Sequence, residues 1–438
     1  MRPILAAALT TALPMLVGQR WITGAPIVRW SLGAVVGIVL LALGALFGGL
    51  LGNPAAGAAL LLLVGWLAAP RLRWDAGRDA FAPEVNRFFI LLVGVGLALM
   101  AMSWFRPVAG WDGWFQWSLK SKGLASTGSF HSPVFVSPAY SWSSQDFPTL
   151  LPSWQAIGYI VSGDLTASWV LQFQQAWLWT AGSIALTALT GAYLGRACLL
   201  LLAWVLTPQV LWQSMQGYAD IPMALFLLIG TIVLRKERSS ARAHALAGLL
   251  LAGAALTKAE GTALAGIVLV CLLATRRPTP ILALAPAIVI AARLPWWLFT
   301  RAHGLTNEHV VSLSAYVTSL ASGEVHVRLP EIGAAMLLEM FVPFRWGLLL
   351  PGCVAVAWVA RRLDGRLAAA GLLQLALFAA VYEVTWSHQG MLLEAFMGMN
   401  AHRVLMAPLG VIALAVGLGA ARRDGLPDVR ATIAPQVT

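Results

Sequence analysis

The feature that most constrains this chain is a succession of long apolar runs separated by short segments that carry arginine. Of its 438 residues, 59% are hydrophobic and only 11% are charged, whereas soluble proteins carry roughly 25% charged residues. A helix of about 20 apolar residues is long enough to cross a lipid bilayer. The sequence therefore predicts an all-α fold, a polytopic transmembrane helical bundle with about 12 to 13 spans.

The apolar runs follow one another along almost the whole chain, near 31–51, 53–69, 88–104, 165–189, 196–214, 219–234, 243–257, 259–275, 279–299, 341–360, 367–386 and 401–420. Segment 3–18 is a further span or a signal-like anchor. These runs divide the chain into N-terminal transmembrane segments (1–84), a transmembrane core (85–420) and a cytoplasmic tail (421–438).

Basic residues mark the sides of the membrane. Loops rich in Lys and Arg stay on the cytoplasmic side, and this rule places the long segments 105–164 and 300–340 on the outer side, where we expect short amphipathic helices. The net charge of +11 is spread over loops and so does not indicate a nucleic-acid-binding face. The three cysteines lie in apolar runs, which favours a packing role over a metal or disulfide framework.

The segment WDGWFQWSLKSKGL (111–124) places an acid among tryptophans at the outer face. Asp112 in this position is a candidate general base, a carboxylate that takes a proton from an attacking hydroxyl or amine. The alternative is an Asp that caps a surface helix beside an aromatic belt. Lys120 and Lys122 oppose the positive-inside bias, and Trp114 and Trp117 are candidate stacking faces for a sugar or a prenyl chain.

Further candidates lie at the outer ends of later spans. Asp146 and Asp220 each precede an apolar residue and a proline, so each is either a helix cap or a substrate ligand. Lys258 and Glu260 share a turn and either pair with one another or hold a phosphate. Arg403 suits a phosphate because its planar fork donates two parallel hydrogen bonds.

In their order and predicted side, these motifs resemble the GT-C superfamily of membrane glycosyltransferases, which includes protein O-mannosyltransferases and bacterial aminoarabinose transferases. The matching segments are WDGWFQWSLKSKGL, QDFPTLLP (145–152), YADIPMAL (218–225), TKAEG (257–261) and AHRVLMAP (401–408). The resemblance covers about 85–420.

The resemblance implies transfer of a sugar from a polyprenyl-phosphate donor to a lipid, glycan or protein acceptor on the non-cytoplasmic face. It implies that Asp112 is the base or substrate anchor, Asp220 the second outer acid, and Lys258 and Arg403 the groups that face the carrier phosphate. Many members carry two adjacent acids in the first loop, whereas here Gly113 follows Asp112, which favours a metal-independent reaction. No organic cofactor is expected, and a divalent metal stays open.

Two other functions remain open at this stage. A secondary transporter or a lipid-linked glycan flippase would use intramembrane acids and lysines as a path. A ligase of lipid-linked glycans would place its chemistry in the 300–340 loop. For all of these we expect a multi-pass protein of the bacterial inner membrane, with its site facing the periplasm or the exterior and membrane lipids around it.

Overall fold

A computed structural model describes the chain over residues 2–69, 72–74, 83–191, 196–236, 240–274, 279–305, 313–324, 327–361, 363–386 and 400–421. Most of the predicted tail (422–438) and parts of the predicted outer loop (306–312 and 325–326) lie outside these residues.

The described residues are overwhelmingly helical, as predicted. The helices of the first half are α1 (Arg2–Gly18), η1 (Gln19–Trp21), α2 (Pro26–Leu50), α3 (Pro54–Leu67), α4 (Pro83–Ser103), η3 (Gly113–Ser118), α5 (Leu119–Thr127), α6 (Pro133–Val136), η4 (Pro138–Ser143), α7 (Leu150–Ser162), α8 (Trp169–Gly191), α9 (Arg196–Val205) and α10 (Pro208–Gln213). Those of the second half are α11 (Asp220–Lys236), α12 (Ala241–Thr257), α13 (Ala259–Leu273), α14 (Pro280–Ala302), α15 (Leu313–Ala321), α16 (Leu329–Met340), α17 (Pro343–Trp346), α18 (Leu349–Ala360), α19 (Gly365–Trp386) and α21 (Met406–Ala421). One short parallel pairing joins β1 (Ile22–Gly24) to β2 (Leu72–Trp74).

Two predicted spans are interrupted, one at a proline and one at a glycine. The apolar run 196–214 divides into α9 and α10 at Pro208, where the side chain of Thr207 accepts a hydrogen bond from the Val210 amide. The run 341–360 divides into α17 and α18 at Gly347, whose φ is +57°. Proline lacks an amide donor and glycine tolerates positive φ, so each break follows from the residue at the break.

Within the described residues, three helices are long and apolar enough to cross a membrane: α2, α14 and α19. Six further apolar helices are shorter, with 10–17 residues. Apolar side chains point outward from both the long and the shorter helices, including Ile290 of α14 at 66% exposure, Ile90 of α4 at 73% and Trp358 of α18 at 78%. Large outward apolar surface of this kind marks a membrane or a partner surface.

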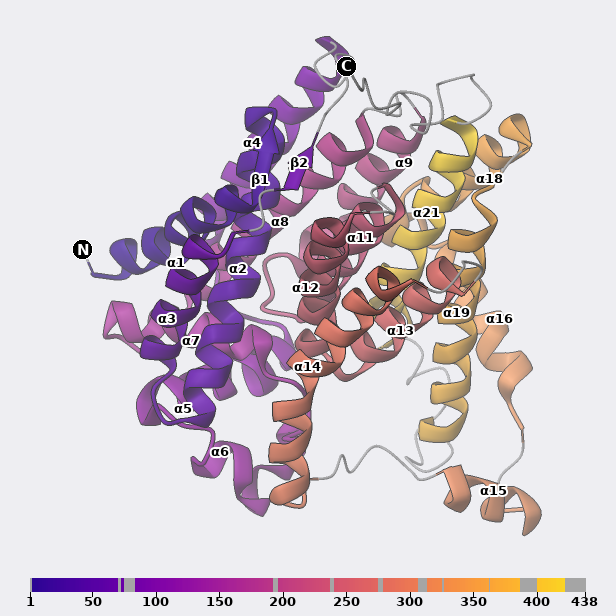
Figure 1. Ribbon diagram of the computed structural model, residues 1–438. Helices are drawn as coiled ribbons and strands as arrows, with labels where there is room; N and C mark the ends of the chain where they lie inside the picture. The colour runs from indigo at the N-terminus through magenta and orange to yellow at the C-terminus, as the bar shows by residue number, and fades with distance from the viewer. Residues whose placement is uncertain are drawn as a thin grey trace.

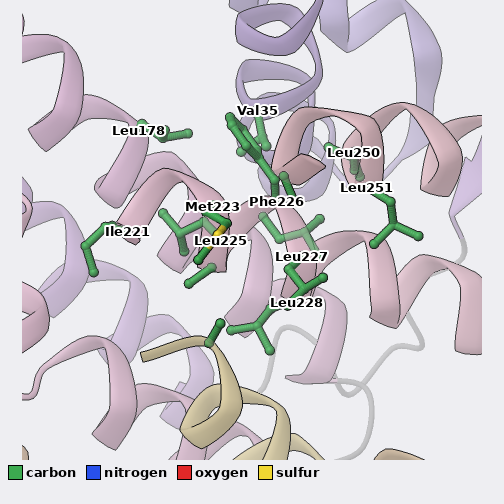
Figure 2. Close-up of a cluster of buried hydrophobic side chains, with 14 of the residues drawn as sticks. Val35, Leu178, Ile221, Met223, Leu225, Phe226, Leu227, Leu228, Leu250 and Leu251 are labelled. Atoms are coloured by element: carbon green, nitrogen blue, oxygen red, sulfur yellow. The ribbon is translucent and has the colours of Figure 1, made fainter. Parts of the chain in front are cut away.

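The core is built around α11, which lies between the N-terminal helices on one side and α18, α19 and α21 on the other (Figure 1). Every residue of α11 from Asp220 to Leu234 is buried. Its apolar side chains spread in several directions, toward Val35 of α2, Leu178 of α8 and Leu250 of α12 (Figure 2). A helix that is apolar all round belongs in the interior of a bundle.

The predicted outer segment 105–164 contains more buried structure than expected. Its last helix, α7, is buried along nearly its whole length rather than amphipathic at the surface. The indole of Trp154 donates a hydrogen bond to the Thr10 carbonyl of α1. Residues 150–162 therefore belong to the helical core, and they support the surface segment that precedes them.

Candidate functional site

Arg403 contacts both Asp112 and Asp220, two of the acids that the sequence singled out. Its Nη2 lies 2.5 Å from Asp112 Oδ2 and 3.3 Å from Asp220 Oδ2. Arg403 precedes α21, Asp220 opens α11 and Asp112 precedes η3, so these contacts bring together three parts of the chain that are far apart in sequence. The ring of Tyr218 also faces the guanidinium, with 4.6 Å from its centroid to Cζ, a cation–π geometry.

Lys258 extends this arrangement. Its Nζ lies 3.0 Å from Asp220 Oδ1 and 3.2 Å from Glu260 Oε1. Asp112, Asp220, Lys258, Glu260 and Arg403 thus form one continuous ion-pair cluster. The predicted pairing of Lys258 with Glu260 is present, and Lys258 contacts Asp220 as well.

Burial differs across the ion-pair cluster in a way that suits a binding site. The Asp220 side chain is fully buried, whereas the side chains of Asp112 and Glu260 are 22% and 24% exposed. Neither Asp112 nor Asp146 caps a helix, since the Asp112 side chain makes no capping hydrogen bond and α7 begins beyond Thr149. The acid of Asp112 is therefore free of a capping role and faces a cation at the accessible edge.

A glutamine fixes the segment that carries Asp112. The side-chain carbonyl of Gln216 accepts hydrogen bonds from the amides of Ala109 (3.3 Å) and Gly110 (2.9 Å). A Cβ at Gly113 would lie 1.8 Å from the Gln216 backbone carbonyl oxygen, so a second acid beside Asp112 does not fit. The residues present therefore do not supply an adjacent acidic pair for a metal.

The turn of η3 that follows is π-helical, a distortion frequent at functional sites. A second glutamine fixes the approach to Asp220: the Gln175 amide of α8 donates to the Tyr218 carbonyl (2.9 Å) and accepts from the Gly217 amide (3.1 Å). Sequence reasoning missed Gln175 and Gln216. Glutamines within the apolar run of α8 were the available signal, because polar groups in such a run need a partner.

Lys120 and Asp146 belong to a neighbouring group. Lys120 is fully buried, and its Nζ donates to the Ser144 carbonyl at 2.6 Å. Burial lowers the pKa of Lys120 to about 7, against the opposing effect of the Asp146 and Asp112 charges. Burial raises the pKa of Asp146, and the positive charges of Lys120 and Arg293 oppose that shift. We call Lys120, Asp146 and Arg293 the Asp146 cluster.

Two predicted site residues, Lys122 and Trp117, take other places, whereas Trp114 stays accessible. Lys122 lies over the Tyr159 ring at 5.8 Å and contacts neither cluster in the interactions of the described residues. Trp117 is fully buried, so it packs in the core and offers no stacking face. Trp114 is 55% exposed and stays available for an apolar ligand.

An exposed aromatic ridge lies beside Asp112. Trp111 stacks on Phe115 with 4.0 Å between ring centroids, and Trp114 and Trp142 meet the same ring edge-on. Trp111 and Trp142 are 68% and 42% exposed. The ridge offers an apolar surface beside the accessible edge of the ion-pair cluster.

Among the described residues, no group of three or more His, Cys, Asp or Glu side chains is arranged to hold a metal ion. No protein-family model, no curated protein and no solved structure matches this chain.

Proposed function

We propose that this chain is a polytopic membrane glycosyltransferase, similar to the GT-C superfamily, that transfers a sugar from a polyprenyl-phosphate donor at the ion-pair cluster. The observation that carries the proposal is the convergence of Asp112, Asp220, Lys258 and Arg403, which lie up to 291 positions apart in the chain. They combine a partly exposed acid with two cations, as displacement of a phosphate leaving group requires.

The distribution of charge along α11 supports the outer side for the reaction. Asp220 lies at one end of this helix, and Arg235 at the other end pairs with Asp364 at 2.7 Å. The 17 residues of α11 span about 24 Å at 1.5 Å per residue, close to the thickness of a bilayer core. With Arg235 on the cytoplasmic side, the ion-pair cluster faces the periplasm or the exterior of a bacterial inner membrane.

In the proposed reaction, the carrier phosphate binds at Arg403 and Lys258, the two cations of the cluster. Asp112 takes the proton of the acceptor hydroxyl or amine as that group attacks the anomeric carbon. The bond from this carbon to the phosphate oxygen breaks, and the phosphate leaves with the electron pair. Asp220 holds both cations in place, since its two oxygens contact Lys258 and Arg403.

The aromatic ridge accounts for the lipid part of the donor. A prenyl chain needs an apolar surface that is open to the bilayer, and Trp111, Trp114 and Trp142 present one next to Asp112. Aromatic side chains of this kind settle at the membrane interface, where the phosphate of a lipid carrier also lies. No organic cofactor is needed in this scheme, because the donor is already activated.

The test is release of polyprenyl phosphate by purified protein in lipid nanodiscs, supplied with a panel of polyprenyl-phosphate sugars and candidate acceptors. We expect release with at least one donor. Glu324→Gln, which changes an exposed acid of the predicted outer loop, serves as the matched control and should keep full activity. Turnover of none of the donors, together with uptake of a substrate into sealed vesicles, would replace this proposal with the transporter alternative.

A further inference from the structure

Three charged side chains, one within the ion-pair cluster and two in the Asp146 cluster, each have a polar atom without a hydrogen-bond partner. Asp146 Oδ1, Glu260 Oε2 and Arg293 Nη1 are buried and make no hydrogen bond. Buried polar atoms in folded proteins are nearly always hydrogen-bonded, since an unsatisfied one is costly. Two acceptors and one donor that remain open beside a candidate site therefore point to a ligand that completes them.

These groups lie around one region. The charges of Lys120, Arg293 and Glu260 all act on the Asp146 carboxyl. Trp296, three residues after Arg293, donates its indole N–H to the Asp146 carbonyl at 3.0 Å, which places α14 against the segment that carries Asp146. Glu260 also contacts Lys258 at 3.2 Å. The region therefore borders the proposed phosphate-binding cations.

The donor or acceptor character of the three unsatisfied atoms indicates what kind of ligand they would bind. Arg293 donates only, and the carboxylates of Asp146 and Glu260 accept when ionised. A hydroxyl group both donates and accepts, so neighbouring hydroxyls can satisfy both kinds of atom. An ammonium group cannot accept a hydrogen bond from Arg293, and an ionised carboxylate cannot donate one to Asp146 or Glu260. Neither charged group therefore satisfies both kinds of open atom.

We propose that Asp146, Glu260 and Arg293, next to Lys120, form a subsite for the hydroxyl groups of an uncharged sugar. This inference rests on the proposed function, and it specifies the donor as a polyprenyl-phosphate-linked neutral sugar rather than an amino sugar or a uronic acid. The sugar then lies between the Asp146 cluster and the two cations that hold its phosphate, and its anomeric carbon faces the ion-pair cluster.

Binding measurements separate the sugar from its carrier. Purified protein in nanodiscs is titrated with polyprenyl phosphate alone and with the same carrier bearing a neutral hexose, an amino sugar or a uronic acid. We expect the neutral sugar to tighten binding roughly tenfold over the bare carrier, the worth of one or two hydrogen bonds. The charged sugars should bind no more tightly than the bare carrier.

Variants assign that gain to the subsite. Asp146→Asn and Arg293→Gln should each remove the sugar-dependent gain, while the dissociation constant for bare polyprenyl phosphate stays within about twofold. Retained binding of the bare carrier also shows that each variant is folded. Arg403→Gln is expected to weaken binding of every carrier, with or without a sugar.

The outcomes separate the two proposals. If bare carrier and neutral-sugar carrier bind equally, or if a charged sugar binds best, the subsite is overturned and the proposed function stands. If Asp146→Asn and Arg293→Gln both keep the full gain, the sugar binds elsewhere and the subsite is likewise overturned. If wild type binds no polyprenyl-phosphate carrier, both proposals fail.

Discussion

The side chains of the ion-pair cluster depend on one another because they are withdrawn from water. Asp220 is fully buried, and Lys258 and Arg403 are 8% and 11% exposed. Removing one partner from a buried pair leaves an uncompensated charge, which destabilises a protein far more than replacing both partners does. The cluster is therefore a structural element of the fold as well as the candidate site.

We predict that Asp220→Asn lowers the free energy of unfolding by about 3–5 kcal/mol, because Lys258 loses its buried carboxylate partner. The double variant Asp220→Asn/Lys258→Gln should be about 1–3 kcal/mol more stable than the sum of the two single losses implies, since it has no lysine without a carboxylate partner. Chemical unfolding in detergent micelles measures the stability of wild type, the two single variants and the double variant. Strictly additive effects would show that the pair is not coupled.

Lys120 predicts a pH dependence of stability. Its pKa is about 7 in the folded protein and 10.5 as a free side chain, so between these values the unfolded chain binds the additional proton. Stability must then rise with pH over this window, by up to about 1.4 kcal/mol per pH unit from this residue. Unfolding free energies at pH 7 and 9 should differ more in wild type than in Lys120→Met. Parallel pH profiles would contradict the prediction.

At the residue scale the sequence predicted the residue types of the site, and the structure brings most of these residues together. Apart from the pairing of Lys258 with Glu260, it did not predict which of these side chains contact one another. Asp112 and Arg403 are 291 positions apart, and their contact depends on how α11, α13 and α21 pack. Trp117 was misjudged because tryptophan suits both a stacking face and a core position, and burial is decided by tertiary packing.

At the scale of elements, the site depends on two short segments packed against each other. Residues 109–113 meet residues 216–218 so closely that Gly113 touches the Gln216 carbonyl and Gly110 touches the Tyr218 ring. Gly217 between them has a φ of +75°, which glycine adopts without strain. This contact keeps Asp112 and Asp220 both within ion-pair distance of Arg403.

We predict that Gly113→Ala destabilises the protein by about 1–3 kcal/mol, since the added methyl group forces these segments apart. Gly266→Ala in α13 is the matched control: a Cβ there meets nothing within 4 Å, and alanine favours a helix interior. Thermal unfolding should show a lower midpoint for Gly113→Ala only. Equal unfolding midpoints for the two variants would mean that residues 109–113 and 216–218 can move apart without loss of stability.

Most helices were predictable from apolar run length, because length and hydropathy are local properties. The breaks at Pro208 and Gly347 were not predicted, although each residue has a local effect that explains its break. The role of α7 was missed for a different reason. It is an apolar helix within a segment assigned to the outer side, and its burial and the contact of Trp154 with α1 place it in the core.

For the whole molecule, α11 links two charged ends through an apolar interior. The ion-pair cluster lies at one end and the Arg235–Asp364 pair at the other, while outer helices turn apolar side chains away from the core. A bilayer around these helices would cover that apolar surface and keep both charged ends in contact with water. In this arrangement the two ends of α11 lie on opposite sides of the membrane.

We predict that cysteines introduced near the two ends of α11 lie on opposite sides of the membrane. Each is introduced singly into a variant whose three native cysteines are replaced by alanine. Ser126→Cys, exposed in α5 of the outer segment, should react with a membrane-impermeant maleimide in spheroplasts with an intact inner membrane. Leu363→Cys, 49% exposed next to Asp364, should react only after permeabilisation. The reverse pattern would invert the topology, and labelling of both in intact spheroplasts would contradict a membrane-spanning α11.

The most direct test of the account compares donor binding and sugar transfer in wild type and Asp112→Asn. The substitution removes the proposed base and frees Arg403 from one of its two carboxylates. The donor should therefore bind at least as tightly as in wild type, while single-turnover transfer should slow by about 100-fold or more, the usual worth of a general base. Transfer within about tenfold of wild type would contradict a catalytic role for Asp112.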